Sequence, residues 1–170
     1  INLAREAGFF GWPYFVANNM AYPDFDYATR QVGDSFNPAA PVNDSPNNTG
    51  IRELPPARPA ILWYPREPTT EFPGMGQGGM NIMVGPVFRS EHYPFAEDKL
   101  PDYFDGKLFF YDWVRGWVKA ATLDQNQRVE QVEPFLDTLQ FAHPMDMRLG
   151  PEGALYVLDY ERASEIIKTA

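Results

Sequence analysis

Residues 105–124 read Asp-Gly-Lys-Leu-Phe-Phe-Tyr-Asp-Trp-Val-Arg-Gly-Trp-Val-Lys-Ala-Ala-Thr-Leu-Asp. Aromatic and aliphatic residues fill 108–113 and recur over 117–123, which is the composition of two pleated, half-buried strands. Between the two runs lies Val114-Arg115-Gly116, where Gly116 can adopt the positive φ that a short hairpin turn requires. The stretch therefore predicts a β-hairpin.

The beginning of this stretch recurs further along the chain. Residues 152–160, Glu-Gly-Ala-Leu-Tyr-Val-Leu-Asp-Tyr, align with 105–113 so that the glycines, the leucines and the aspartates coincide. The two glycines, Gly106 and Gly153, are 47 residues apart. Four-stranded propeller blades repeat at roughly 40 to 50 residues, so this spacing predicts two neighbouring blades.

Composition narrows the class of protein. The chain has 170 residues with 17 prolines, 13 glycines and 15% aromatic residues, which favours many short strands joined by ordered loops. A net charge of −9 with scattered basic residues argues against nucleic-acid binding. No apolar run is long enough to span a membrane, and the absence of cysteine excludes disulfides and zinc–thiolate sites. The chain starts at Ile1 without a signal-peptide pattern, so we expect a fragment of a longer protein.

The predicted fold is all-β: a fragment of a six-bladed β-propeller, with about one full four-stranded blade, parts of its neighbours and a long ordered loop insertion. The loop is expected at 18–59, where Asn, Asp, Pro and Tyr dominate, and a short strand is expected at 60–64. The segments of this single partial domain (1–170) are the end of a preceding blade with the insertion (1–79), a complete blade (80–137), the start of the next blade (143–160) and a tail of helix-compatible composition (161–170).

Antiparallel alternation predicts where polar side chains should gather. The connection from the second to the third strand lies at the same end of a sheet as the start of the first strand. One face should therefore hold Asp112, Trp113, Arg115, Trp117, His143 and Asp146. As a site, Arg115 and His143 would bind a cofactor, and the other residues would contact substrate. The alternative is structural, with aspartates bonding turn amides, tryptophans filling the space between sheets and Arg115 solvated.

Other catalytic chemistry has little support in the sequence. The two histidines, His92 and His143, are far apart, and no metal-ligand spacing or Ser-His-Asp grouping can be assembled. We therefore predict no catalytic residue and no metal ligand. Paired acids such as Asp112 and Asp146 leave glycoside hydrolysis as a weaker alternative.

Several stretches, in this order, resemble landmarks of one lineage. They are Gly-Phe-Phe-Gly-Trp-Pro-Tyr (8–14), Pro-Val-Asn-Asp-Ser-Pro-Asn-Asn-Thr-Gly (41–50), Ala-Ile-Leu-Trp-Tyr-Pro (60–65), Gly-Pro-Val-Phe (85–88), Phe-Asp-Gly-Lys-Leu-Phe-Phe-Tyr-Asp-Trp-Val-Arg-Gly-Trp (104–117), and the run from Pro-Met-Asp-Met to Leu-Asp-Tyr (144–160). Together they resemble the glucose/sorbosone dehydrogenase-like six-bladed propellers, in particular those of large secreted multimodular bacterial proteins. The resemblance covers residues 1 to about 160.

This resemblance implies a soluble, secreted or periplasmic enzyme that uses pyrroloquinoline quinone (PQQ) to oxidise a sugar, with calcium possible in the parent protein. In such enzymes, cationic residues of the two connections described above contact the quinone. Here Val114 stands where a lysine is expected, and His143 and Met145 stand where arginines are expected. The family's catalytic histidine would lie on an earlier blade. The alternative function is a non-catalytic module that binds carbohydrate or a protein partner.

A blade without its ring neighbours exposes apolar faces and strand edges. We therefore expect this chain either to self-associate or to cover the open face with the loop 18–59.

Overall fold

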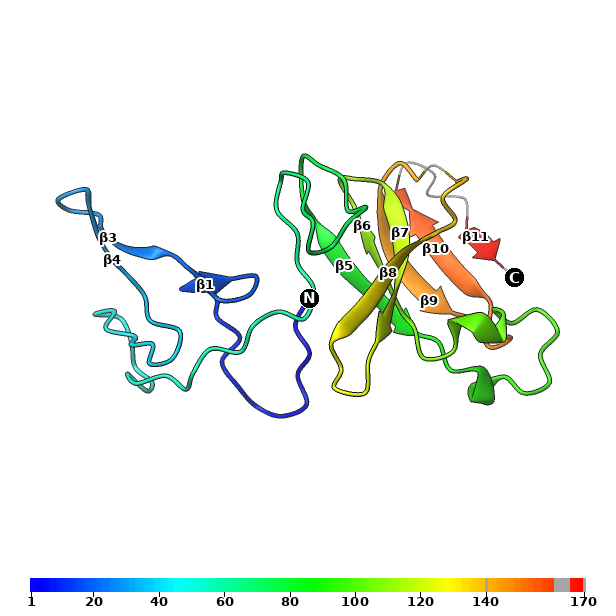
Figure 1. The fold of residues 1–170 in the computed structure, drawn as a ribbon, viewed down its shortest axis with the longest axis horizontal. Coiled ribbons are helices and arrows are strands. Elements are labelled where there is room, and N and C mark those ends of the chain that lie inside the picture. The colour runs from blue at the N-terminus through cyan, green and yellow to red at the C-terminus, as the bar shows by residue number, and fades with distance from the viewer. Residues whose placement is uncertain (140, 161–165, 170) are drawn as a thin grey trace. The chain divides into compact units, whose positions relative to one another are not determined.

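The computed structural model describes residues 1–139, 141–160 and 166–169. Over these residues every sheet is antiparallel, and the only helices are two short 3₁₀ turns, η1 (Ser90–His92) and η2 (Asp102–Phe104). The all-β prediction is confirmed. The chain divides into two compact units, Ile1–Trp63 and Tyr64–Ala170, which we describe separately (Figure 1).

The first unit consists of two small hairpins and their connections. β1 (Phe15–Val16) pairs with β2 (Met20–Ala21), and β3 (Pro23–Asp26) pairs with β4 (Gln31–Ser35). Phe15 is almost fully buried and packs edge-on against the rings of Phe9 and Tyr14. The predicted long loop is ordered, but it contains paired strands.

The strand predicted at 60–64 is not formed. Ala60 and Ile61 instead donate single backbone hydrogen bonds, to the carbonyls of Ala17 and Ile1 respectively. Prolines at positions 59 and 65 bracket the run, and a proline cannot donate to a strand ladder. The apolar composition of this run therefore reflects burial, as Leu62 shows, and not strand pairing.

The second unit begins with a four-stranded sheet in the order β5-β6-β7-β8. Its strands are β5 (Ile82–Val87), β6 (Leu108–Asp112), β7 (Trp117–Leu123) and β8 (Val129–Phe135). All four lie within the predicted segment 80–137, in simple succession. The register of β5 on β6 shifts between Val84 and Val87, at the Gly85-Pro86 step, because a proline cannot donate to the strand ladder.

A three-stranded sheet follows, in the order β11-β10-β9. It contains β9 (Pro144–Leu149), β10 (Leu155–Asp159) and β11 (Ile166–Thr169). Residues 166–169, which the sequence analysis placed in a tail of helix-compatible composition, instead form a strand, and all four pair with residues 155–158 of β10. The β-branched Ile-Ile-Lys-Thr sequence suits a strand, and β10 offers it an edge. Residues 161–165 and 170 lie outside the described part of the chain.

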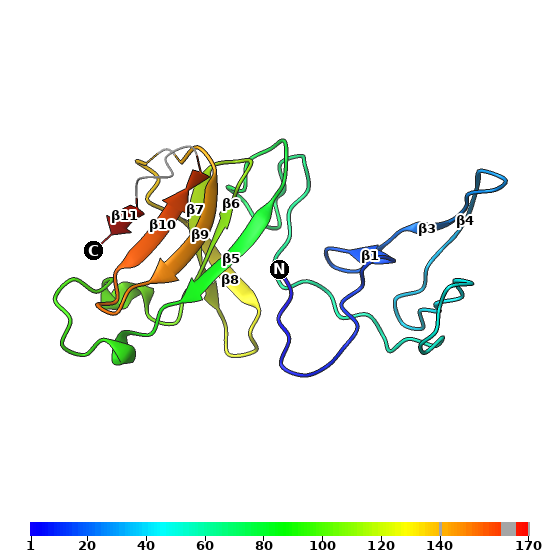
Figure 2. The same cartoon turned by 180° about the vertical axis from the view of Figure 1, so that it is seen from behind.

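The two sheets of the second unit pack face to face (Figures 1 and 2). Buried side chains of both sheets and of the adjoining loops form one core: Phe88, Leu100, Phe109, Tyr111, Val118, Ala120, Phe135, Phe141, Met147, Leu155 and Val157. Fully burying one large apolar side chain stabilises a fold by roughly 1.5–3 kcal/mol. A Cβ on Gly85 of β5 would lie 2.7 Å from the Met147 sulfur of β9, so glycine permits this close approach.

The repeated nonapeptides thus occupy equivalent places. Each contributes the second strand of its own sheet, β6 and β10. Each also has a glycine with positive φ two positions before that strand, Gly106 (78°) and Gly153 (80°). Each second strand pairs antiparallel with the first strand of its sheet, β5 or β9. The described strands form no closed barrel or propeller ring.

Candidate functional site

Two connections meet at one end of the packed sheets. They are the β6–β7 loop (113–116) and the segment that leads into β9 (141–143). Gly116, with φ of 62°, lies so close to the second segment that a Cβ would be 2.5 Å from the Phe141 carbonyl oxygen. The Nδ1 atom of His143 lies 3.0 Å from the Trp113 carbonyl oxygen. The antiparallel geometry expected from the sequence brings these two connections together.

Three aromatic side chains gather where the connections meet. The Trp113 and His143 rings are stacked, with centroids 4.8 Å apart and planes within 12°. The Tyr160 ring lies 5.3 Å from that of Trp113, and its backbone N–H donates to the His143 carbonyl. Trp113 and His143 are half-buried, whereas Tyr160 is 58% exposed. We call Trp113, His143 and Tyr160 the aromatic cluster.

Asp112, predicted to contact substrate, is fully buried and bonded to its own protein. Its Oδ1 accepts hydrogen bonds from the backbone N–H groups of Val114 and Arg115, both at 2.7 Å. Its Oδ2 accepts from the Asn81 N–H at 2.9 Å and from the Tyr64 hydroxyl. The carboxylate therefore closes the hairpin turn and fixes the start of β5, which is the structural alternative.

Asp159 plays the same part in the second sheet. It too is fully buried, and its two oxygens accept hydrogen bonds from the backbone N–H groups of Ala142 and His143, both at 2.7 Å. The coincidence of the aspartates in the nonapeptides signalled this role. Sequence reasoning did not select Asp159, although it holds in place the segment that presents His143.

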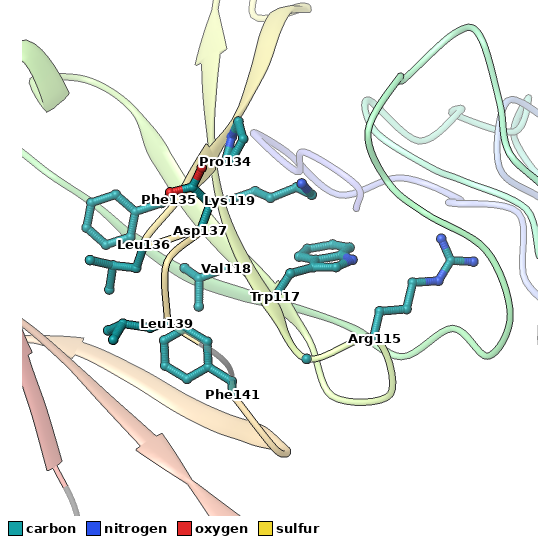
Figure 3. Close-up of a pocket in the computed structure, with 11 residues that line it drawn as sticks. Arg115, Trp117, Val118, Lys119, Pro134, Phe135, Leu136, Asp137, Leu139 and Phe141 are labelled. Atoms are coloured by element: carbon teal, nitrogen blue, oxygen red, sulfur yellow. The ribbon is translucent and has the colours of Figure 1, made fainter.

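Arg115, predicted as a cofactor contact, reaches the segment 64–79, where its guanidinium is hydrogen-bonded, and Figure 3 shows its side chain extended from the β6–β7 loop. Its guanidinium lies 4.5 Å from the centroid of the Tyr64 ring. It donates hydrogen bonds to four backbone carbonyls, those of Pro65 (2.8 Å), Met75 (2.8 Å), Gly78 (3.3 Å) and Gly79 (2.8 Å). Arg115 therefore holds this segment, with four hydrogen bonds from its five N–H donors made within the chain.

Trp117 also contacts the segment 64–79. Its Nε1–H donates to the Met75 carbonyl at 3.2 Å, and its ring packs edge-on against Tyr64 and Phe110. Asp146 lies further along β9, where its carboxylate pairs with Arg148 at 3.2 Å. Neither residue is among the ring contacts of the aromatic cluster. Of the predicted site residues, the structure brings Trp113 and His143 together and adds Tyr160.

Tyr160 was not selected as a site residue from the sequence. It occupies the last position of the second nonapeptide, and Trp113 occupies the same position of the first. The two rings therefore meet because equivalent positions of two packed sheets lie at the same end. The alignment of the two nonapeptides could therefore have identified Tyr160 as a neighbour of Trp113.

A pocket of about 340 Å³ lies beside the same loop. It is lined by Arg115, Gly116, Trp117, Val118, Lys119, Pro134, Phe135, Leu136, Asp137, Leu139 and Phe141 (Figure 3). Lys119 is only 7% exposed, and burial lowers the pKa of its ammonium group. The pocket therefore combines apolar walls with one buried cation.

The described residues do not fit the quinone that the family resemblance implies. PQQ is a planar polycarboxylate, which needs several cationic or N–H donors. The Arg115 guanidinium is engaged by backbone carbonyls, and His143 Nδ1 faces the Trp113 carbonyl. Within 1–139, 141–160 and 166–169 no cluster of three or more acidic or histidine side chains is placed to hold a metal ion.

Comparison with known proteins gives no family assignment, because no protein-family model, curated protein or solved structure matches the chain. No helix in the described part of the chain has the length and apolar character needed to cross a membrane.

Proposed function

We propose that this chain is part of a non-catalytic, carbohydrate-binding module of the β-propeller type, in which the two sheets of the second unit are neighbouring blades. Three features support the propeller: the 47-residue offset of the nonapeptides, the four-stranded meander, and the packing of the second sheet against it. A complete propeller of this type would contain further blades.

The aromatic cluster is the observation on which the binding function rests. Sugar rings present apolar C–H faces, and partly exposed aromatic rings are the protein surfaces that stack against them. Trp113 and His143 form a preformed stack, held by the His143–Trp113 contact at 3.0 Å and by Asp159 behind it. Tyr160 adds an exposed ring 5.3 Å away, with a hydroxyl available for polar recognition. A rigid platform of this kind binds with little loss of side-chain freedom.

Binding without catalysis is favoured over sugar oxidation because the polar groups near the cluster are engaged. Asp112 and Asp159 are fully buried on backbone N–H groups, and Arg115 is bonded to four carbonyls. The two buried aspartates are therefore unavailable as general bases, and Arg115, the predicted cationic contact for a quinone, is occupied by carbonyls. Quinone-dependent oxidation, calcium binding and a secreted or periplasmic location remain predictions from the resemblance.

The test is binding of the 170-residue chain to a glycan array, followed by titration of the best-binding oligosaccharide against variants. Trp113→Ala and Tyr160→Ala should each weaken binding by roughly tenfold or more, equivalent to about 1.4 kcal/mol. Trp12→Ala is the matched control, because Trp12 is a 73% exposed tryptophan of the first unit and should bind as the wild type does. Unchanged affinity in both cluster variants, with their circular dichroism preserved, would remove the aromatic cluster from the site.

A further inference from the structure

Among the described residues, Lys119 is a buried cation that has neither a hydrogen-bond partner nor an ion-pair partner. It lies on β7 opposite Pro134 of β8, with 7% of its surface exposed. Its ammonium nitrogen is 5.1 Å from the centroid of the Trp117 ring. Within the described part of the chain it makes no hydrogen bond and no ion pair, whereas the comparably buried Lys107 is paired with Glu133 at 2.5 Å. Lysines are almost never buried to this degree unless an anion or acceptor meets them.

The pocket beside Lys119 has room for such a partner. Its volume of about 340 Å³ falls in the range of small-ligand sites. Figure 3 shows an apolar group of side chains on one side and Trp117 with Lys119 on the other. The apolar group consists of Val118, Phe135, Leu136, Leu139 and Phe141. The acidic lining residue, Asp137, is exposed and forms no ion pair with Lys119.

We propose that this pocket binds a small organic acid, whose carboxylate accepts hydrogen bonds from the Lys119 ammonium and whose apolar part lies against Phe135, Leu136 and Phe141. This site is separate from the aromatic cluster and does not depend on the proposed carbohydrate binding. A monocarboxylate suits one cation better than a phosphate does, because a phosphate dianion needs further donors and Arg115 has given its donors to carbonyls. A neutral sugar would leave Lys119 unpaired.

Ligand binding has a spectroscopic consequence. Burial lowers the pKa of Lys119 in the free protein. A bound carboxylate favours the charged ammonium and therefore raises that pKa again. Binding of the carboxylate and protonation of Lys119 therefore favour each other, and the expected change is a rise in the pKa of this lysine.

The experiment uses benzoate as the probe and benzamide as a neutral probe of the same shape. Isothermal titration of the whole chain should show benzoate binding at least tenfold more tightly than benzamide. Lys119→Met should abolish this preference, whereas Lys99→Met, which removes a lysine that is not among the pocket residues and pairs with Asp102, should keep it. Nuclear magnetic resonance titration of the lysines should show the pKa of Lys119 rising when benzoate is added.

A second measurement separates a ligand site from a structural lysine. If the partner of Lys119 is an external anion, Lys119→Met removes a buried charge that is unpaired in the ligand-free protein. The ligand-free variant should therefore unfold at a higher urea concentration than the ligand-free wild type. Equal affinity for the two probes, no binding of benzoate, or a Lys119→Met protein less stable than the wild type would each overturn the proposal.

Discussion

Replacing Arg115 tests whether one side chain holds the segment 64–79 against the sheet. Arg115→Met keeps the length of the aliphatic stem and removes every donor of the guanidinium group. Four backbone carbonyls would lose their partner, three of them at 2.8 Å from the guanidinium nitrogens. The contact of 4.5 Å between the guanidinium and the Tyr64 ring would be lost too.

The expected cost follows from the geometry of these bonds. Each of the three short, partly buried bonds contributes about 1 kcal/mol net, since water reaches some of the freed carbonyls. The cation–π contact adds about 0.5 kcal/mol at a half-exposed site. We therefore expect Arg115→Met to lower the free energy of unfolding by about 3 kcal/mol. Arg115→Lys should recover about one bond of the four, because an ammonium group cannot span carbonyls that the planar fork reaches together.

Urea denaturation and hydrogen exchange together measure this effect. Denaturation gives the global loss, and the Gly78 N–H, which donates to the Arg66 carbonyl at 2.7 Å inside the segment, reports its local opening. The control is Arg148→Met, because Arg148 has an 80% exposed side chain and pairs with Asp146 alone, so it should change stability by less than about 0.5 kcal/mol. If Arg115→Met matches Arg148→Met in both measurements, the anchoring role of Arg115 is refuted.

Three further predictions concern buried contacts of the second unit. Burial, together with the bond to Asp112, raises the pKa of Tyr64, so the stability from its neutral phenol is present below pH about 10 and falls above it. Tyr64→Phe should lower the free energy of unfolding by about 1–2 kcal/mol at pH 7. Denaturation midpoints of this variant should fall less steeply at alkaline pH than those of the wild type. Burial opposes ionisation of Glu133, but hydrogen bonds from Lys107 and a neighbouring tyrosine outweigh it and lower its pKa. The stability from this carboxylate is present above pH about 4.3 and is lost as the pH falls through its native value, so Glu133→Gln should cost about 2 kcal/mol at neutral pH and little at pH 2, measured by thermal unfolding. Gly116→Ala should lower the free energy of unfolding by about 2 kcal/mol or more, because a φ of 62° is unfavourable for alanine and its Cβ would lie 2.5 Å from a carbonyl oxygen of the facing loop. A variant as stable as the wild type in urea would contradict this contact.

Local patterns predicted the strands of the second unit well. Runs of aromatic and aliphatic residues, together with the nonapeptide repeat, identified the region of β5 to β10. Over 166–169 the prediction was wrong because the surrounding composition suits a helix, while the open edge of β10 decides in favour of a strand. The strand predicted at 60–64 was also wrong, because an apolar run can be buried without forming a ladder of hydrogen bonds.

The site was predictable only in part. The meeting of Trp113 and His143 follows from antiparallel alternation, which a sequence pattern can show. The direction of Arg115 does not follow from any pattern, because its partners are backbone carbonyls of residues 36 to 50 positions earlier in the chain. The role of Asp112 was left open between substrate contact and turn, and its full burial on N–H groups gives the second role.

The nonapeptide repeat explains why a fixed hairpin turn and an aromatic surface occur together. Its aspartate ends the second strand and bonds the backbone just before the first strand, so it fixes where that strand starts. Its last residue, the aromatic that follows the aspartate, is thereby placed at the end of the sheet. When two such sheets pack face to face, Trp113 and Tyr160 must approach each other, and His143 is held between the aspartate bond and the Trp113 ring. A further sheet built on the same nonapeptide would add another aromatic residue to this row, so the aromatic surface would lengthen with each repeat and need no separate set of residues.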